Sequence, residues 1–237
     1  MYDRPFTKEN LDLYLRELAK EYRKRNGRGM PAEIVLIGGA AILLNYGFRG
    51  MTYDTDAIIS AASSMKDAVN AVADRYSLPN GWMNADFMRT PSYTPAILRH
   101  SKYYRTYANV VTFRTVCREY LIAMKLMAGR RYKNDLSDVV GILWDHERNG
   151  DPVRPEEVRR AAADLYGSYE ALPEGSRTFF ESVTAAGGYE RLYREVRAAE
   201  TENREALLAF QQEYPGTVNM DNADEILDAI RRKKERD

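Results

Sequence analysis

Two aspartates separated by one residue are the side chains of this chain best suited to bind a divalent cation. Asp54 and Asp56 are followed directly by the apolar residues 57–59. On a strand, side chains two positions apart point to the same face, so the two carboxylates would share one side of a predicted strand. Carboxylate oxygens are the ligands that Mg²⁺ prefers, and two like charges on one face repel unless a cation or water relieves them. The pair predicts a metal site; a solvated acid pair at a strand edge is the alternative.

A diglycine upstream of the two acids has the features of a phosphate-binding turn. The β-branched run Ile34–Ile37 predicts a short strand, and residues 40–46 predict a helix. Gly38 and Gly39 stand between them, where a missing Cβ lets an anion approach the backbone and the helix N-terminus offers unpaired N–H groups. A diglycine that only forms a turn is the alternative.

A lysine and two further acids lie later in the chain. Lys125 stands inside an apolar helical run, where its ammonium would be costly to bury without an anionic partner. A phosphate could be that partner, or the lysine could reach water along an apolar surface. Asp135 and Asp138 follow the basic turn 129–134 and could line a site, cap the next helix, or do both.

These motifs together resemble the nucleotidyltransferase superfamily, in which a Gly-Gly or Gly-Ser turn opens a helix and a later strand carries Asp-x-Asp. The resemblance is closest to a minimal bacterial branch related to the abortive-infection toxins of toxin–antitoxin systems, and it runs from about Pro31 to His146. It rests on Gly38, Gly39, Ala40, Ala41, Arg49, Thr52, Asp54 and Asp56.

The resemblance implies Mg²⁺-dependent transfer of a nucleoside monophosphate from a nucleoside triphosphate to a hydroxyl group of RNA or protein. It implies that Asp54 and Asp56 bind the metal and act in catalysis together with Lys125. The residues that would bind the substrate or its phosphates are Gly38, Gly39, Arg49, Thr52, Arg130 and Asp135. An antitoxin partner is implied as well.

A third carboxylate, which most active members of the superfamily carry on a further strand, has no clear counterpart. The predicted strand Asn109–Arg114 contains no acid, and Asp86 is the nearest candidate. A chain without this group could bind a nucleotide without transferring it, or could work less efficiently with one metal fewer. A catalytically inactive nucleotide-binding or protein-interaction module of the same fold is therefore the alternative function. A P-loop kinase or dinucleotide enzyme has no support because neither GxxxxGK nor GxGxxG is present.

The elements that must position these residues predict an α/β fold followed by helices. Lys8–Arg25 and Ser63–Tyr76 show helical spacing of apolar residues, and Ser101–Arg114 predicts two strands joined near Ala108-Asn109. Further helices are predicted over residues 135–147, 155–165, 175–185, 189–211 and 224–234. We therefore predict a nucleotidyltransferase-like domain over residues 1–150, with a small mixed sheet flanked by helices, and a helical domain over residues 151–237.

Composition fits a cytoplasmic globular protein. The chain has 237 residues, of which 44% are hydrophobic and 30% charged, and no apolar run approaches the roughly 20 residues that span a bilayer. The single cysteine, Cys117, cannot form an intrachain disulfide, which favours a reducing compartment. The two histidines, His100 and His146, lack cysteine partners, which argues against a zinc site.

Charge is distributed unevenly along the chain. Residues 1–150 carry about six more cations than anions, and the remainder about six more anions than cations. Two basic stretches, residues 23–28 and the tyrosine-containing segment 102–114, could attract an RNA acceptor. A solvated helix end and a tyrosine-rich hairpin are the alternative interpretation.

Overall fold

The computed structural model describes residues 5–219 and 222–234. Contacts between residues divide the chain into two compact units. Unit 1 comprises Met1–Met124 and Glu156–Ala171, and unit 2 comprises Lys125–Pro155 and Leu172–Asp237. The first boundary falls inside the helix α4 (Arg118–Ala128). The predicted division at residue 150, into a nucleotidyltransferase-like domain and a helical domain, stays a prediction.

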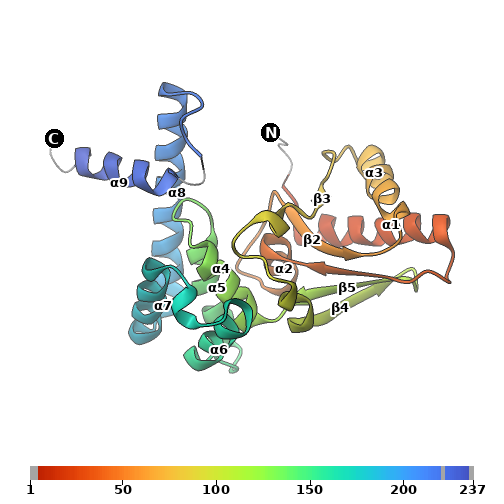
Figure 1. Cartoon of the computed structure of the whole chain (residues 1–237), viewed down its shortest axis with the longest axis horizontal. Helices are drawn as coiled ribbons and strands as arrows, with labels where there is room; N and C mark the ends of the chain where they lie inside the picture. The colour runs from red at the N-terminus through yellow and green to blue at the C-terminus, as the bar shows by residue number, and fades with distance from the viewer. Residues whose placement is uncertain (1–4, 220–221, 235–237) are drawn as a thin grey trace. The chain divides into compact units, whose positions relative to one another are not determined.

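Unit 1 is built on a mixed sheet, as predicted. In its described residues the sheet has five strands in the order β3-β2-β1-β5-β4 (Figure 1). The central strand β1 pairs antiparallel with β2 and parallel with β5, β2 pairs parallel with β3, and β5 pairs antiparallel with β4. The strands are β1 (Ala32–Leu36), β2 (Thr55–Ser60), β3 (Met83–Asn84), β4 (Ser101–Tyr107) and β5 (Val111–Val116).

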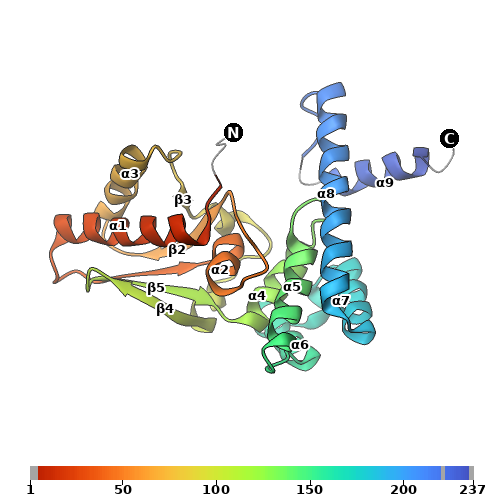
Figure 2. The same cartoon turned by 180° about the vertical axis from the view of Figure 1, so that it is seen from behind.

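Helices α1 (Lys8–Asn26) and α3 (Ser64–Tyr76) lie side by side in unit 1 (Figures 1 and 2). Thr7 caps α1 in a capping box, with Asn10 as the reciprocal partner, and this motif typically contributes about 1 kcal/mol. Apolar side chains at helical spacing face the sheet because burying them there removes their surface from water. The shared core contains Leu11, Leu15, Leu18, Tyr22, Met65, Val69, Val72, Ile34, Leu36, Ala57 and Phe113.

The predicted hairpin is present between β4 and β5. Its connecting residues Ala108 and Asn109 have φ values of 52° and 53°. Two consecutive residues with positive φ match the right-handed twist of the flanking strands, which is why such turns are favoured in tight hairpins.

The sequence predicts neither a helix nor a strand between α3 and β4. It contains the two-residue strand β3 and the 3₁₀ turns η1 (Asp86–Arg89) and η2 (Pro95–His100). Trp82 fixes the start of this segment because its indole N–H donates to the carbonyl oxygen of Val69 at 3.1 Å and its ring is buried. A two-residue strand has no detectable sequence period, so tertiary packing alone determines its position.

Helices form unit 2, as the sequence predicts for the C-terminal region. They are α5 (Asp135–Arg148), α7 (Glu174–Ala186), α8 (Tyr189–Glu213) and α9 (Ala223–Lys234); α6 (Pro155–Tyr166) falls almost entirely in unit 1. Helix α5 packs along α8. A small apolar cluster of Leu207, Ala223 and Leu227 joins α8 to α9.

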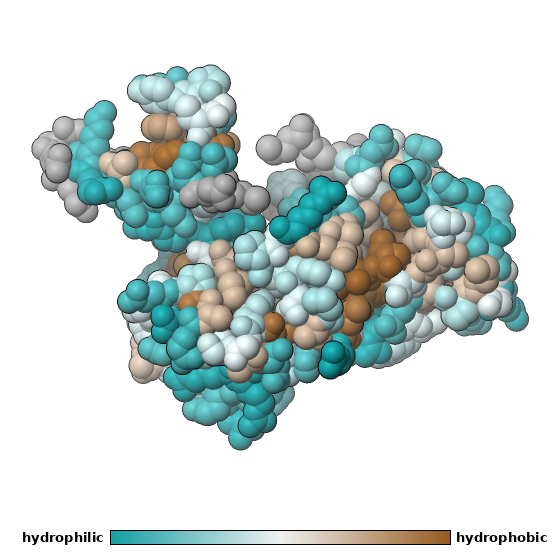
Figure 3. Space-filling view, in the orientation of Figure 1, coloured by the Kyte–Doolittle hydropathy of each residue, from teal (hydrophilic) through white to brown (hydrophobic). Residues whose placement is uncertain are grey.

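The surface shows where apolar residues remain partly uncovered. In Figure 3 a hydrophobic strip lies over the strands of unit 1, bordered by hydrophilic side chains, and a second hydrophobic group lies where α8 meets α9. Across residues 5–219 and 222–234, no helix combines the length and the apolar character needed to cross a membrane.

Candidate functional site

The N-terminus of α2 (Gly38–Asn45) has the chemistry of a phosphate site. The N-cap residue is Ile37, whose apolar side chain makes no capping hydrogen bond. Gly38 has a φ of 54°, a left-handed conformation that costs an L-residue roughly 1–2 kcal/mol, so glycine is the residue that fits best. The first N–H groups of a helix have no partner inside it and carry a partial positive charge, which favours a bound anion.

Asp56 lies beside this glycine turn. A Cβ atom on Gly38 would be 3.6 Å from Oδ2 of Asp56, and the backbone N–H of Ile37 donates to the carbonyl oxygen of Asp56 at 3.0 Å. Asp56 is the second residue of β2 and is half-buried. The structure therefore places one predicted metal ligand directly against the predicted phosphate-binding turn.

Asp54 immediately precedes β2 and is exposed. Thr55, between the two acids, is fully buried in the core of unit 1. This alternation of exposure agrees with the predicted arrangement, in which Asp54 and Asp56 lie on the face of the strand away from that core.

Arg49 and Thr52 lie against the second glycine of the turn. A Cβ atom on Gly39 would be 2.4 Å from Oγ1 of Thr52 and 3.0 Å from Nη2 of Arg49. The structure thus brings both residues to the turn. Thr52 is 3% exposed, which favours a structural role for its hydroxyl; the predicted phosphate contacts of Arg49 and Thr52 stay predictions.

Replacing Gly39 by alanine is expected to destabilise the protein by about 1–3 kcal/mol, because the added methyl group would overlap the Thr52 side chain. The loss would occur although alanine is favoured over glycine inside a helix by about 1 kcal/mol. Urea denaturation measures the effect. Gly47→Ala is the matched control, since a Cβ there would meet no atom within 4 Å. Equal stability of the two variants would contradict the close approach of Thr52 to the turn.

The strand next to the acids contributes an amide side chain that the sequence did not reveal. In the β2–β3 pairing, Asn84 is the register partner of Asp56 and Met83 is the partner of Thr55. Partners on paired strands point to the same face, so Asn84 lies on the Asp56 side. Its Oδ1 accepts the backbone N–H of Asp86 at 2.8 Å. An asparagine that accepts the N–H two residues later is typical of a turn, and the sequence Asn84-Ala85-Asp86 fits this pattern.

Asp86, the candidate third carboxylate, lies in η1 just after β3. Its side chain is 77% exposed and forms an ion pair of 4.0 Å with Arg89. Within the described part of the chain, no group of three or more acidic, histidine or cysteine side chains is arranged to hold a metal. The role of Asp86 as a third ligand stays a prediction.

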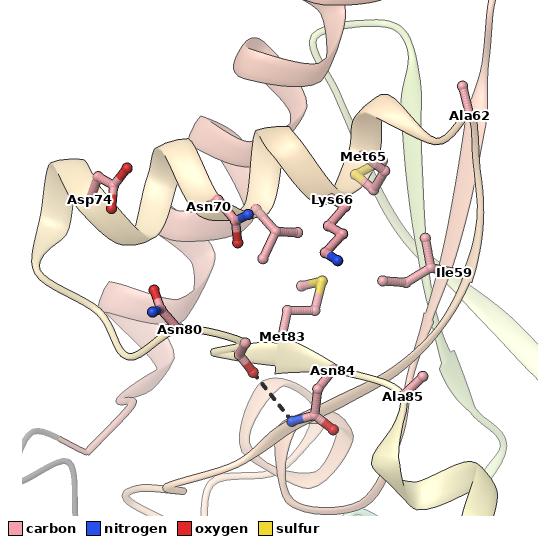
Figure 4. Close-up of a pocket in the computed structure, with 12 residues that line it drawn as sticks. Ile59, Ala62, Met65, Lys66, Asn70, Asp74, Asn80, Met83, Asn84 and Ala85 are labelled. Carbon is pink, nitrogen blue, oxygen red and sulfur yellow. Dashed lines mark hydrogen bonds between the residues drawn. The ribbon is translucent and has the colours of Figure 1, made fainter.

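A cavity of about 820 Å³ lies between α3 and the edge formed by β2 and β3 (Figure 4). Met83 points toward α3 in this view, whereas Asn84 points away from α3, on the other side of the strand. Since Asp56 shares the face of Asn84, the floor of this cavity belongs to the opposite face of the sheet from the acids. The cavity is therefore not part of the candidate site.

Unit 2 contains a second cluster of predicted site residues. The ammonium Nζ of Lys125 lies 2.9 Å from Oδ1 of Asp135 and 2.8 Å from Oδ2 of Asp138. The guanidinium Nε of Arg130 lies 2.7 Å from Oδ2 of Asp135. Both carboxylates are almost fully buried, with 1% and 2% of their side-chain surface exposed.

Charge pairing controls the ionisation of this cluster. Burial alone would raise the pKa of Asp135, but Lys125 and Arg130 more than offset it and lower the pKa to about 2. The carboxylate is thus ionised at neutral pH. The anionic partners of Lys125 in the structure are Asp135 and Asp138, and its contact with phosphate stays a prediction.

Glu200 caps the helix that carries these acids, a role that no motif in the sequence indicates. From α8, Oε1 of Glu200 accepts the backbone N–H groups of Leu136 and Ser137 at 2.9 and 3.1 Å, and Oε2 accepts the hydroxyl of Ser137. Asp135 and Asp138 lie in the first turn of α5, but the capping oxygens come from Glu200. Burial raises the pKa of Glu200 to about 7, although its three donors favour the charged form.

Stability is expected to depend on pH through Glu200. The pKa of the folded state, about 7, lies above the ordinary value of 4.5, so the folded protein holds this proton more tightly than the unfolded chain. The resulting stabilisation is complete below about pH 4.5 and is lost as pH rises through about 7. We expect the free energy of unfolding of the wild type, relative to Glu200→Gln, to fall over this interval by about 1–3 kcal/mol in urea denaturation. Parallel pH curves would contradict this prediction.

Comparison with known proteins adds one finding. The family model described as nucleotidyltransferase of unknown function (DUF6036) matches residues 13–143. This stretch contains the glycine turn, the Asp54–Asp56 strand and the cluster around Lys125. No curated protein and no solved structure matches the chain.

Proposed function

Because this chain belongs to the family of nucleotidyltransferases of unknown function, whose model spans residues 13–143, we propose that it transfers a nucleoside monophosphate from a nucleoside triphosphate to a hydroxyl group of RNA or protein. The observation that carries the proposal is the position of the Asp56 carboxylate against Gly38 at the N-terminus of α2. A triphosphate with its cation needs this combination of a carboxylate and unpaired backbone N–H groups.

The residues present fit Mg²⁺. Asp54 and Asp56 would hold it, since carboxylate oxygens are hard ligands and Mg²⁺ completes its coordination with water and substrate phosphates. When bound, the ion would supply charge stabilisation to the triphosphate. The absence of a third acid among the described residues is compatible with this fit, because two carboxylates are a common protein contribution to a Mg²⁺ site.

The transfer itself would need little covalent chemistry from the protein. The acceptor hydroxyl oxygen would bond to the α-phosphorus, the bond from that phosphorus to the bridging oxygen would break, and pyrophosphate would leave with the negative charge. The hydroxyl proton would pass to a carboxylate or to water. The N–H groups of the Gly38-Gly39 turn would bind phosphate oxygens, and the positioning of these groups is the main contribution to the rate.

A catalytically inactive nucleotide-binding module is the second candidate. One observation favours it: no third acidic group accompanies Asp54 and Asp56 in the described residues. Both candidates bind a nucleoside triphosphate, but only the enzyme releases pyrophosphate from it.

The test is incubation of the protein with Mg²⁺ and each of the four α-labelled nucleoside triphosphates, together with total RNA or total protein. The enzyme hypothesis predicts label in one acceptor class and an equal amount of pyrophosphate. Nucleotide binding without pyrophosphate release would support the inactive module, and the absence of both would contradict either candidate.

The resemblance to abortive-infection toxins extends the proposal to a bacterial toxin–antitoxin system. The cytoplasmic acceptor would then be an RNA or protein of the host cell, and a partner antitoxin would suppress the transfer. Induced expression should slow bacterial growth for the wild type and not for Asp56→Asn. Equal growth of the two strains would contradict the toxin role and leave the transfer activity to be decided by pyrophosphate release.

A further inference from the structure

The loop between α2 and β2 has two buried residues, Tyr46 directly after α2 and Thr52 close to the acid strand. Residues 47–54 are all described, and among them Thr52 is the one buried side chain, whereas the others are exposed or half-buried. This loop carries Arg49 and ends in Asp54. Contacts that hold the loop in place therefore also hold these two residues at the candidate site. Thr52 is the buried residue of this loop that lies nearest in sequence to Asp54.

The N-terminal segment holds the backbone of Thr52. The N–H of Phe6 donates to the carbonyl oxygen of Thr52 at 2.7 Å, and the N–H of Thr52 donates to the carbonyl oxygen of Phe6 at 2.9 Å. Phe6 is 1% exposed, and its ring contacts Tyr14 and Trp82. Phe6 also precedes the residues that the family model matches. The backbone bridge is thus fixed to the core of unit 1.

The hydroxyl of Thr52 joins three parts of the site. Its Oγ1 accepts a hydrogen bond from Nη2 of Arg49 at 3.4 Å and donates one to the carbonyl oxygen of Asp54 at 3.2 Å. The same oxygen lies in close contact with Gly39, where a Cβ atom would be 2.4 Å away. One buried oxygen therefore connects the loop, the glycine turn and the acid strand.

We infer that Thr52 is a positioning residue, whose hydroxyl sets the position of Asp54 relative to the glycine turn. A hydrogen bond to the Asp54 carbonyl restricts rotation of the planar peptide group that follows Asp54, and so restricts the direction of its side chain. Asp54 precedes the first residue of β2, so the regular ladder does not fix it. The inference rests on the proposed function, in which Asp54 helps to hold the cation.

The same geometry argues against direct phosphate binding by Thr52. Its side chain is 3% exposed, and its hydroxyl already accepts one hydrogen bond and donates another. A hydroxyl has a single proton to donate, so a phosphate could be bound only after the bond to Asp54 breaks. In this inference Thr52 acts on the site indirectly, through the backbone of Asp54.

Two variants separate the hydroxyl from the rest of the side chain. Thr52→Val keeps the shape and the backbone bridge but removes the hydroxyl, and Thr52→Ser keeps the hydroxyl and removes a methyl group. Hydrogen–deuterium exchange of the amides of residues 53–55 reports the loop directly, without any activity. Calorimetric titration with Mg²⁺ in the presence of a non-hydrolysable nucleoside triphosphate reports the site. Thermal denaturation checks that both variants are folded.

In Thr52→Val, the amide hydrogens of residues 53–55 should exchange at least fivefold faster than in the wild type. The affinity for Mg²⁺ should be about five- to tenfold weaker, which is the effect of losing one ordinary hydrogen bond. Thr52→Ser should stay within about twofold of the wild type in both measurements. Unchanged exchange in Thr52→Val, or equal losses in both variants, would overturn the inference.

Failure of the proposed function gives a different result. In that case the wild type itself would show no Mg²⁺ titration, and Asp56→Asn would not differ from it. Amide exchange alone would then test the inference. Faster exchange in Thr52→Val, with exchange in Thr52→Ser as in the wild type, would support the anchoring of Asp54. Equal exchange rates in the two variants would overturn it.

Discussion

Asp56→Asn is expected to lower the rate of pyrophosphate release by about 10²–10³-fold, the range found when one charge-stabilising group is removed from an active site. Asparagine has nearly the same shape, so the contact beside Gly38 should remain while the negative charge is lost. The loss of charge should raise the Mg²⁺ concentration needed for half-maximal rate. Steady-state kinetics at several Mg²⁺ concentrations separate this effect from a change in nucleotide binding.

Asp67→Asn is the matched control for this variant. Asp67 is an exposed acid on α3, so its replacement makes the same change of charge away from the glycine turn. We expect its rate to remain within about twofold of the wild type, as is usual for an exposed surface charge. Equal rates for Asp56→Asn and Asp67→Asn would contradict the assignment of Asp56 to the site.

Lys125→Met is expected to give the largest loss of stability, about 3–5 kcal/mol, because it removes the ammonium from two buried carboxylates. Arg130 would still face Asp135, so the greater part of the loss should come from Asp138. Urea denaturation followed by circular dichroism measures the effect. Lys133→Met is the matched control, since Lys133 is exposed and lies in the loop before α5.

A double variant tests the electrostatic origin of this loss. In Lys125→Met with Asp138→Leu, an apolar pair replaces the buried charges, and such replacements are often neutral or stabilising. We therefore expect the double variant to be more stable than Lys125→Met alone. Equal stability of Lys125→Met and Lys133→Met would show that the ammonium does not neutralise these carboxylates. The predicted contact with phosphate would then better explain why a lysine stands at position 125.

Elements with a clear sequence period were predicted correctly. The predicted helix Lys8–Arg25 corresponds to α1, and the predicted strand Ile34–Ile37 corresponds to β1. Both were predictable because amphipathic spacing and β-branched composition reflect burial on one face. The hairpin near Ala108-Asn109 and the later helices are also confirmed. The resemblance to nucleotidyltransferases is confirmed by the family match. These features depend on the order of residues within a short segment, which can be read from the sequence alone.

Contacts between distant segments were not predictable in the same way. Asn84 lies beside Asp56 because the two-residue strand β3 pairs with β2, and Glu200 caps α5 from a helix more than sixty residues later. Thr52 was singled out as a phosphate ligand, and only its hydrogen bonds to Arg49 and Asp54 indicate the indirect role. A buried polar group satisfies its hydrogen bonds wherever the fold brings a partner, and the sequence carries no marker for that partner.

Paramagnetic relaxation by Mn²⁺, used in place of Mg²⁺, tests the central assignment most directly. The protein is labelled with ¹⁵N and titrated with Mn²⁺ in the presence of a non-hydrolysable nucleoside triphosphate. Convergence of the glycine turn and the two acids predicts that the amide signals of Gly38, Gly39, Asp54 and Asp56 broaden first, and that Asp56→Asn abolishes this broadening. Unbroadened signals at these four residues, with the strongest effect elsewhere in the chain, would contradict the assignment.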